Sequence, residues 1–203
     1  MTSRRRPEFR IFSAVCEIAG PRTRDGERDG AMTDQDAIDL ALLAFRCAVG
    51  AVMLAHGINH IIGGGRIPGV AGWFKSLGMR QPTLQAWLAS LTEVGAGALL
   101  VLGLLTPFGG AGVVGTMAVA WIINHRTNGF FIFRPGEGWE YVMTLLFCGA
   151  LLGTVGPGQW SLDHALGIDD DLIGLPGLLI SVGAGGVGAI ALLLVFWRPP
   201  TTS

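Results

Sequence analysis

The sequence predicts an all-α membrane protein: a transmembrane four-helix bundle followed by one further transmembrane helix near the C-terminal end. The first observation is composition, since 50% of the 203 residues are hydrophobic, only 14% are charged and 32 are glycines. That is too apolar for an ordinary soluble domain. The second observation is that apolar residues come in long runs, and about 20 apolar residues cross the hydrocarbon core of a bilayer. Lipid is therefore the predicted surrounding of most of the chain.

Residues 1–37 differ from the rest and are predicted to form a polar, disordered N-terminal tail. The segments MTSRRRPEFR and PRTRDGERDG are charged and rich in Gly and Pro, a composition typical of disorder. Between them, Ile11–Ala19 is apolar but too short to span a bilayer. The sequence leaves open whether the protein starts at Met1 or at Met32.

Five apolar runs follow the tail, and each is predicted to be one membrane helix. In order, they are Ile38–Ile62, Leu84–Leu105, Phe108–Ile123, Trp139–Val155 and Leu172–Trp197. The first four belong to the predicted bundle, residues 38–166, and residues 167–203 hold an acidic loop and the additional helix. Small residues recur at four-residue spacing in two runs, at Ala111 and Gly115 and at Ser181, Gly185 and Ala189. Such rows suit close helix packing in lipid, and Gly- and Ala-rich helices could also join copies of the chain into a homo-oligomer.

Charge separates the two predicted sides of the membrane. Arginine and lysine lie in the loops after the first and third runs and after the fifth run, at Arg66, Lys75, Arg80, Arg126, Arg134 and Arg198. The other side carries acidic residues instead, at Asp163, Asp169, Asp170 and Asp171. Because short loops rich in Lys and Arg stay in the cytoplasm, the basic loops and the C-terminal end are predicted to be cytoplasmic.

Polar residues gather at the predicted basic side. The stretch HGINH places His56 and His60 four residues apart, so both rings lie on one helix face. Glu93 lies about nine residues inside the second run, where a carboxylate is costly unless it is paired or protonated. Four more candidates belong to the same side, namely Asn59, His125, Asn128 and Glu140.

The residues alone leave several interpretations of this cluster open. It could be the polar rim of the membrane helices, or it could bind a quinone head group and relay its protons, since histidine titrates near neutrality. A third interpretation, which we favour at this stage, pairs Glu93 with Arg46 as a buried structural ion pair. A metal site is not predicted, because Gly57 stands where the zinc motif HExxH needs its glutamate.

The order of several short motifs resembles one family. HGINH is followed by WFKSLGM, LTEVGAGALLVLGLLTP, NGFF, GEGWEY and GPGQWSLD. Together these resemble the DoxX family of small multi-pass membrane proteins over about residues 38–166. The chain departs from the family pattern at His60, where lysine is more usual, and in its tail and additional helix.

The resemblance implies a bundle in the bacterial plasma membrane and a link to redox chemistry. Members of the family include subunits of quinone-linked sulfur oxidation and proteins that hold soluble redox-stress enzymes at the membrane. We therefore expect an accessory subunit or anchor of a membrane-associated oxidoreductase assembly, with soluble redox enzymes bound at its cytoplasmic face. The alternatives are a quinone-binding subunit of a thiosulfate-type quinone oxidoreductase and a small proton-coupled transporter or export factor.

The sequence also limits cofactors and partners. It has no recognisable nucleotide motif and no iron–sulfur or haem ligand pattern, so a quinone is the one cofactor left open. Net charge is −1, and no basic patch with interleaved aromatics is present, so nucleic acid is not an expected partner.

Overall fold

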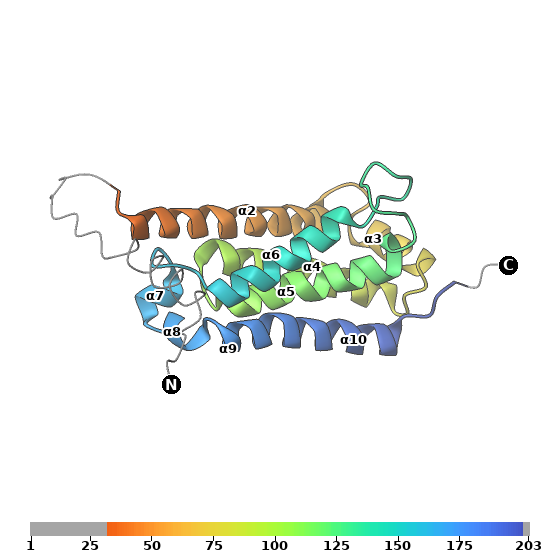
Figure 1. The fold of residues 1–203 in the computed structure, drawn as a ribbon. Coiled ribbons are helices and arrows are strands. Elements are labelled where there is room, and N and C mark those ends of the chain that lie inside the picture. Colours follow the sequence, from red (N-terminus) through yellow and green to blue (C-terminus); the bar gives the residue numbers. More distant parts are fainter. Residues whose placement is uncertain (1–31, 201–203) are drawn as a thin grey trace, which may run out of the picture. The chain divides into compact units, whose positions relative to one another are not determined.

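The computed structural model describes residues 32–200 (Figure 1), which leaves residues 1–31 of the predicted tail outside the described residues. The described part confirms the all-α fold. Its regular elements are helices, apart from one isolated β-bridge between Met79 and Trp197. Residues 34–200 form one compact unit.

The elements follow one another along the chain as long helices joined by short helices and loops. They are α2 (Asp34–Ile62), α3 (Arg66–Ser76), α4 (Pro82–Leu102), α5 (Thr106–Ala120), η1 (Trp121–His125), α6 (Glu140–Val155), α7 (Leu162–Leu166), α8 (Asp169–Leu172), α9 (Leu175–Leu178), η2 (Leu179–Ala184) and α10 (Gly185–Phe196). The two η elements are π-helical turns: η1 ends α5, and η2 joins α9 to α10.

Four stretches of the described chain are long and apolar enough to cross a membrane, namely Asp34–Ile62, Pro82–Leu102, Thr106–His125 and Leu175–Phe196. The predicted additional helix is thus one of the four. The predicted fourth run became α6, which has only 16 residues and so measures about 24 Å. It stops where Gly156 adopts a φ of 85° and Pro157 follows, the usual end of a helix. The protein is a multi-pass membrane protein with α6 as a short helix inside its bundle.

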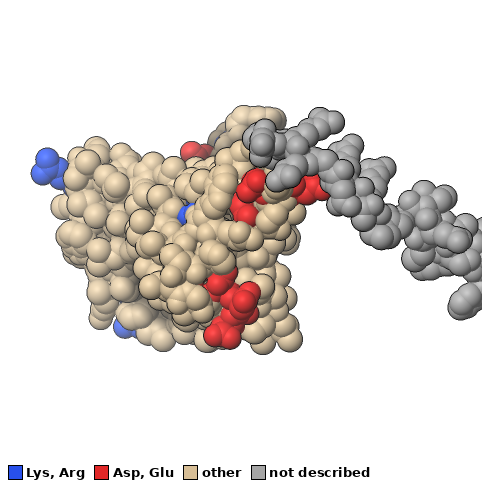
Figure 2. Space-filling model, turned by 90° about the vertical axis from the view of Figure 1, so that its left-hand side faces the viewer, with Lys and Arg blue, Asp and Glu red and all other residues tan. Residues whose placement is uncertain are grey.

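The two ends of the bundle differ in charge. The first end holds the start of α2 together with α7 and α8 (Figure 1), and its acidic residues are Asp34, Asp36, Asp39, Asp163, Asp169, Asp170 and Asp171. We call it the acidic end, and Figure 2 looks onto it. The other end, called the basic end, holds α3 and the loop before α6. Arg46 is the one Lys or Arg among residues 32–200 that does not belong to it.

Glycine and serine bring α2 and α4 close together. A Cβ added at Gly50 would lie 2.8 Å from the Gly97 carbonyl oxygen, and one added at Gly57 would lie 2.8 Å from that of Ser90. Both pairs are seven residues apart along their helices, so the contact repeats after two turns. Such small residues allow backbone contact between helices in lipid, and here they fix which residues of α2 and α4 face each other.

The small-residue rows predicted from the sequence pack α5 against the η2–α10 segment. A Cβ added at Gly115 would lie 3.1 Å from the Gly185 carbonyl oxygen, and one at Gly185 would lie 2.6 Å from the Ala111 oxygen. Ser181 and Ala189 are buried in the same seam. An oligomer through these residues would have to displace packing within the chain, and the homo-oligomer stays a prediction.

The end of α10 is hydrogen-bonded to the loop between α3 and α4. The Arg80 amide donates to the Phe196 oxygen at 2.7 Å, and the Arg198 amide donates to the Gly78 oxygen at 2.9 Å. The Trp197 indole donates to the Leu77 oxygen at 2.9 Å. These bonds hold α3 across the basic end, where its aromatic residues border the candidate site.

Candidate functional site

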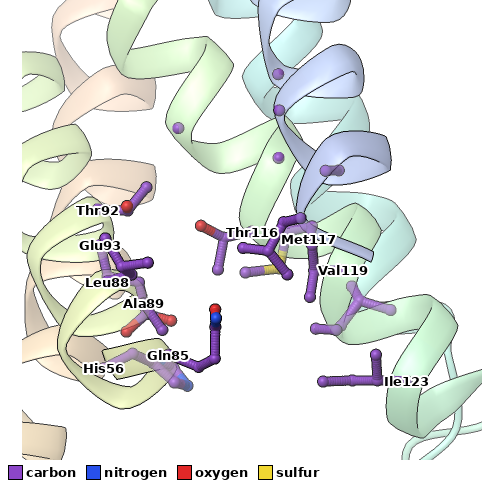
Figure 3. A pocket seen from close by; sticks show the side chains of 18 of the residues that line it. His56, Gln85, Leu88, Ala89, Thr92, Glu93, Thr116, Met117, Val119 and Ile123 are labelled. Atoms are coloured by element: carbon purple, nitrogen blue, oxygen red, sulfur yellow. The ribbon is translucent and has the colours of Figure 1, made fainter. Parts of the chain in front are cut away.

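A cavity of about 540 Å³ lies toward the basic end of the bundle. That volume is within the range of small-molecule sites, roughly 300–1,000 Å³. Figure 3 shows α4 on one side of the cavity and α5 with α10 on the other. Four of the sequence-predicted residues line it: His56, His60, Glu93 and His125. The interpretation that these side chains form one cluster therefore agrees with the geometry.

Glu93 and His60 form the polar centre of the cavity. Glu93 is only 5% exposed, and its Oε2 lies 3.1 Å from Nδ1 of His60. Gly57, between the two histidines of HGINH, makes the approach possible, because a Cβ there would lie 2.9 Å from the Cβ of Glu93. Among the described residues, neither Oε2 nor Nδ1 has a hydrogen-bond partner. Their contact is thus electrostatic and poorly aligned, and both atoms can still pair with a ligand.

The predicted Arg46–Glu93 ion pair is wrong. The Arg46 guanidinium donates instead to the carbonyl oxygens of Leu100 at 3.1 Å, Val101 at 2.6 Å and Trp160. Leu100 and Val101 are in the last turn of α4, whose carbonyl oxygens lack partners inside the helix and carry the negative end of its dipole.

The rise along the helices explains the error. Leu100 follows Glu93 by seven residues, so Arg46 lies about 10 Å nearer the acidic end. The acidic side chain that acts electrostatically on Arg46 is Asp163. The polar contacts of Arg46 therefore do not include Glu93, and the ion-pair contact of Glu93 is with His60.

His125 and His56 are oriented by backbone oxygens. His125 is buried at the end of the π-helical turn η1, and its Nδ1 lies 2.9 Å from the Glu137 oxygen. His56 has Nδ1 2.9 Å from the Val52 oxygen and its ring 6.1 Å from that of Tyr141. Since a carbonyl oxygen can only accept, both Nδ1 atoms carry hydrogen. The Nε2 atoms are then the acceptors of the two rings, and that of His125 lies 3.4 Å from the Asn124 amide nitrogen.

Gln85 is the residue that sequence reasoning missed. It is 2% exposed, lines the cavity, and has no partner for its Nε2 within the described part of the chain. Figure 3 shows its amide reaching into the cavity. One signal was available: Gln85 and Glu93 are eight residues apart, about two helical turns, and so lie on one face of α4.

Three predicted residues do not line the cavity. Asn59 is exposed on α2. Asn128 holds the loop before α6, since its Nδ2 donates to the oxygens of Gly136 at 2.6 Å and Glu137 at 3.1 Å. Glu140 accepts from the Ile132 amide at 3.0 Å. The last two shape the loop that carries Glu137, which borders the cavity.

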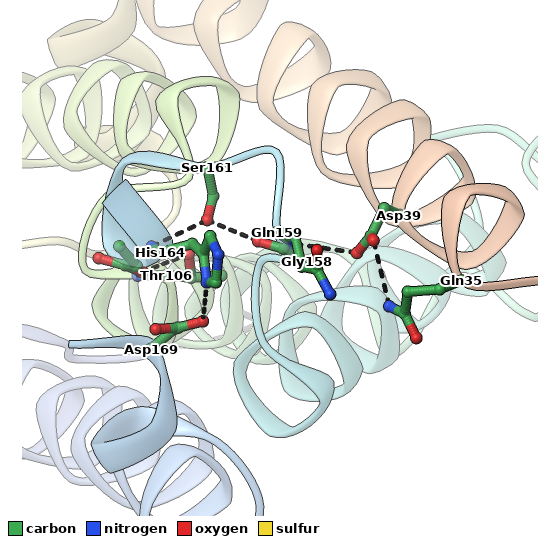
Figure 4. Close-up of polar contacts among 9 residues, drawn as sticks. Gln35, Asp39, Thr106, Gly158, Gln159, Ser161, His164 and Asp169 are labelled. Atoms are coloured by element: carbon green, nitrogen blue, oxygen red, sulfur yellow. Dashed lines mark hydrogen bonds and ion pairs between the residues drawn. The ribbon is translucent and has the colours of Figure 1, made fainter. Parts of the chain in front are cut away.

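The acidic end holds a second set of buried polar residues (Figure 4). Asp163 is fully buried and accepts from the Leu105 amide at 2.6 Å, the Thr106 amide at 3.0 Å and the Thr106 hydroxyl at 2.9 Å. From α7 it thereby caps the N-terminus of α5. Asp39 accepts from the Gln159 amide at 2.9 Å and from the Gln35 side chain at 3.1 Å. Both carboxylates therefore have their hydrogen-bond donors within the protein.

The chemistry of the cavity follows from its lining. Most lining residues are apolar, and the polar ones offer a carboxylate, an amide and imidazoles. Nowhere in residues 32–200 do three His, Cys, Asp or Glu side chains come close enough to hold a metal ion. The arrangement suits a lipophilic molecule with oxygen atoms at one end, and it can hold protons beside that end.

Comparison with known proteins supports the resemblance found in the sequence. The family model described as DoxX matches residues 41–126, which run from α2 to just beyond η1 and include His56, His60, Gln85, Glu93 and His125. The match ends before α6 and α10, although both helices contribute to the cavity. No curated protein and no solved structure matches the chain.

Proposed function

We propose, for a multi-pass membrane protein whose residues 41–126 are a DoxX domain, that it is the quinone-binding membrane subunit of a redox assembly. The observation that supports this is a pair of buried polar atoms in an apolar cavity, Nε2 of Gln85 and Oε2 of Glu93, neither of which has a hydrogen-bond partner in the described chain. Oε2 of Glu93 has the ion-pair contact with His60. A buried polar atom left unpaired costs about 1–3 kcal/mol. A quinone carbonyl oxygen can accept from the Gln85 amide, and a hydroxyl of the reduced quinol can donate to Oε2 of Glu93, so a bound ligand would recover part of that free energy.

The residues fit a quinone. The Gln85 amide can donate to a quinone carbonyl oxygen, and the His60 ring, held beside Glu93, offers a second polar contact. The apolar remainder of the lining suits the ring body. A bound quinone would supply two-electron chemistry coupled to two protons. Glu93 and the histidines are the groups of this chain that can hold those protons.

The location of the cavity favours this proposal over a transporter. A transporter needs access to its site from both sides of the membrane in turn. Here the cavity lies toward the basic end, whereas the acidic end is filled by Arg46 and Asp163 with their backbone partners. The proposed subunit would sit in the bacterial plasma membrane with its basic end in the cytoplasm. A soluble redox enzyme bound there would exchange electrons with the quinone, which keeps the predicted anchoring role within the same proposal.

The test is a binding titration on the full-length protein in mild detergent. Menadione is the probe, and quenching of tryptophan fluorescence is the signal, because Trp73 lines the cavity. We expect saturable quenching that Gln85→Leu weakens about tenfold, equal to the roughly 1.4 kcal/mol of a hydrogen bond.

Asn59→Leu is the matched control, since Asn59 carries an exposed amide at the same end outside the cavity. It should bind menadione as the native protein does. Absence of saturable binding to the native protein, or equal affinity of Gln85→Leu, would contradict the proposal.

A further inference from the structure

The cavity continues as a groove along the side of the bundle. Both α4 and α10 pack against α5, and Figure 3 shows the space between them. The floor of this groove is made by small residues of α5, namely Ala111, Gly112 and Gly115, and further along by Val119 and η1 residue Ile123. From Ile123 to Ala111 the chain rises about 18 Å. The groove therefore reaches from the polar cluster across more than half the thickness of the hydrocarbon core.

The groove is open along its length. Leu88 and Thr92 on α4 line it and are exposed, with Leu88 at 42%. On the opposite wall, Ala184 and Gly188 line it and are exposed as well. These residues belong to stretches long and apolar enough to cross a membrane, so the opening faces lipid.

Gly188 gives the groove its width on the α10 side. A Cβ added there would meet no atom within 4 Å, in contrast to Gly185 one turn earlier, where it would lie 2.6 Å from the Ala111 oxygen. Gly185 thus packs the helices together, whereas a side chain at Gly188 would enter the groove. The buried polar atoms that lack hydrogen-bond partners within residues 32–200, on Gln85, His60 and Glu93, lie at one end of this apolar channel.

Resting on the proposed function, we infer that the ligand is a membrane quinone with a long hydrocarbon tail, which enters sideways from the bilayer. Its head group lies at Gln85 and Glu93, and its tail lies in the groove against α10. The helix that lies outside the DoxX match then determines which quinone binds, because it forms the wall of the tail channel.

The test compares two probes that share a ring system and differ in the tail. Menadione has no tail, and a menaquinone carries a polyprenyl tail; both are titrated into the detergent-solubilised full-length protein. Gly188→Leu should weaken menaquinone binding at least about tenfold, as expected for steric exclusion from a fitted apolar site, and leave menadione binding within about twofold.

Gly186→Leu is the matched control, because Gly186 is on the same helix, does not line the groove, and also has open space at its Cβ. It should leave both affinities unchanged. If Gly188→Leu does not yield a folded protein by thermal unfolding, Ala184→Leu narrows the same wall one turn earlier and must give the same selective loss.

The outcomes separate the two proposals. Selective loss of menaquinone binding supports the tail channel. Equal loss of both probes, or no loss of either, overturns it while leaving quinone binding itself intact. Failure of both probes to bind the native protein overturns the proposed function instead.

Discussion

The two ends of the bundle place buried polar groups in the same apolar surroundings and satisfy them differently. At the acidic end, Asp163 accepts three hydrogen bonds and Arg46 donates to three carbonyl oxygens. Of the Arg46 nitrogens, only Nε lacks a partner in the described chain. At the basic end, Gln85 and Glu93 each keep a buried atom without a hydrogen-bond partner among the described residues. An unpaired polar atom is costly in lipid. We therefore interpret the hydrogen-bonded residues of the acidic end as structural, and the unpaired atoms of the basic end as part of a ligand site.

The largest loss of stability is expected from removing the Arg46 guanidinium at the acidic end. Arg46→Gln removes the positive charge from the end of α4 and leaves buried Asp163 without it, a loss of ~3–5 kcal/mol for a broken buried charge interaction. We expect a strong fall in folded protein recovered from the membrane, measured by size-exclusion chromatography in detergent. Glu93→Gln, the matched change at the basic end, should leave recovery near normal.

The double variant Arg46→Gln/Glu93→Gln tests the corrected pairing. Since the two residues share no partner, their effects should add, so the double variant should be no better recovered than Arg46→Gln alone. Better recovery of the double variant than of Arg46→Gln alone would instead indicate a direct interaction between Arg46 and Glu93.

A smaller loss is expected where α2 and α4 meet. Gly57→Val places a side chain against the Ser90 oxygen and the Glu93 side chain, and overpacking of this kind costs about 1–3 kcal/mol. Thermal unfolding should show a lowered midpoint, and menadione binding should weaken because His60 moves away from Glu93. Gly69→Ala, on α3 with open space at its Cβ, is the control that should change neither the unfolding midpoint nor menadione binding. Unchanged menadione binding by Gly57→Val would show that the contact between α2 and α4 does not position His60 in the site.

The sequence was sufficient for the long helices, because runs of apolar residues specify membrane helices with little help from tertiary contacts. It placed His56, His60, Glu93 and His125 together, because antiparallel helices bring residues of equal depth to one level. It did not single out Gln85, since an amide near a helix start has no distinctive pattern and only its spacing from Glu93 places it on the same helix face. It also mispaired Arg46, because counting charges overlooked backbone carbonyl oxygens as partners. Those oxygens become available only where a helix ends.

The next change is expected to raise the stability of the ligand-free protein. Gln85→Leu removes a buried amide that lacks a partner for its Nε2, so we expect the ligand-free protein to gain about 1 kcal/mol in free energy of unfolding. Asp39→Leu, the comparison at the acidic end, removes a carboxylate that holds the Gln159 amide and should destabilise the protein. Thermal unfolding in detergent measures both shifts. A destabilised Gln85→Leu would mean that its amide is already satisfied and would remove the difference between the two ends.

The smallest effect concerns pH at the surface of the acidic end. The hydrogen bond from His164, 2.8 Å away, lowers the pKa of Asp169 below its usual range. Since a lowered folded-state pKa stabilises the charged form, its contribution is present above the ordinary aspartate pKa of about 4 and is lost as the pH falls through the lowered value. The pair is exposed, so the effect is small. Asp169→Asn should lower the unfolding midpoint slightly at pH 7 and not at pH 2, whereas Asp171→Asn, an exposed neighbour, should show no such difference. If Asp169→Asn lowered the unfolding midpoint equally at both pH values, the loss would not depend on the charge of the carboxylate, and the prediction would be wrong.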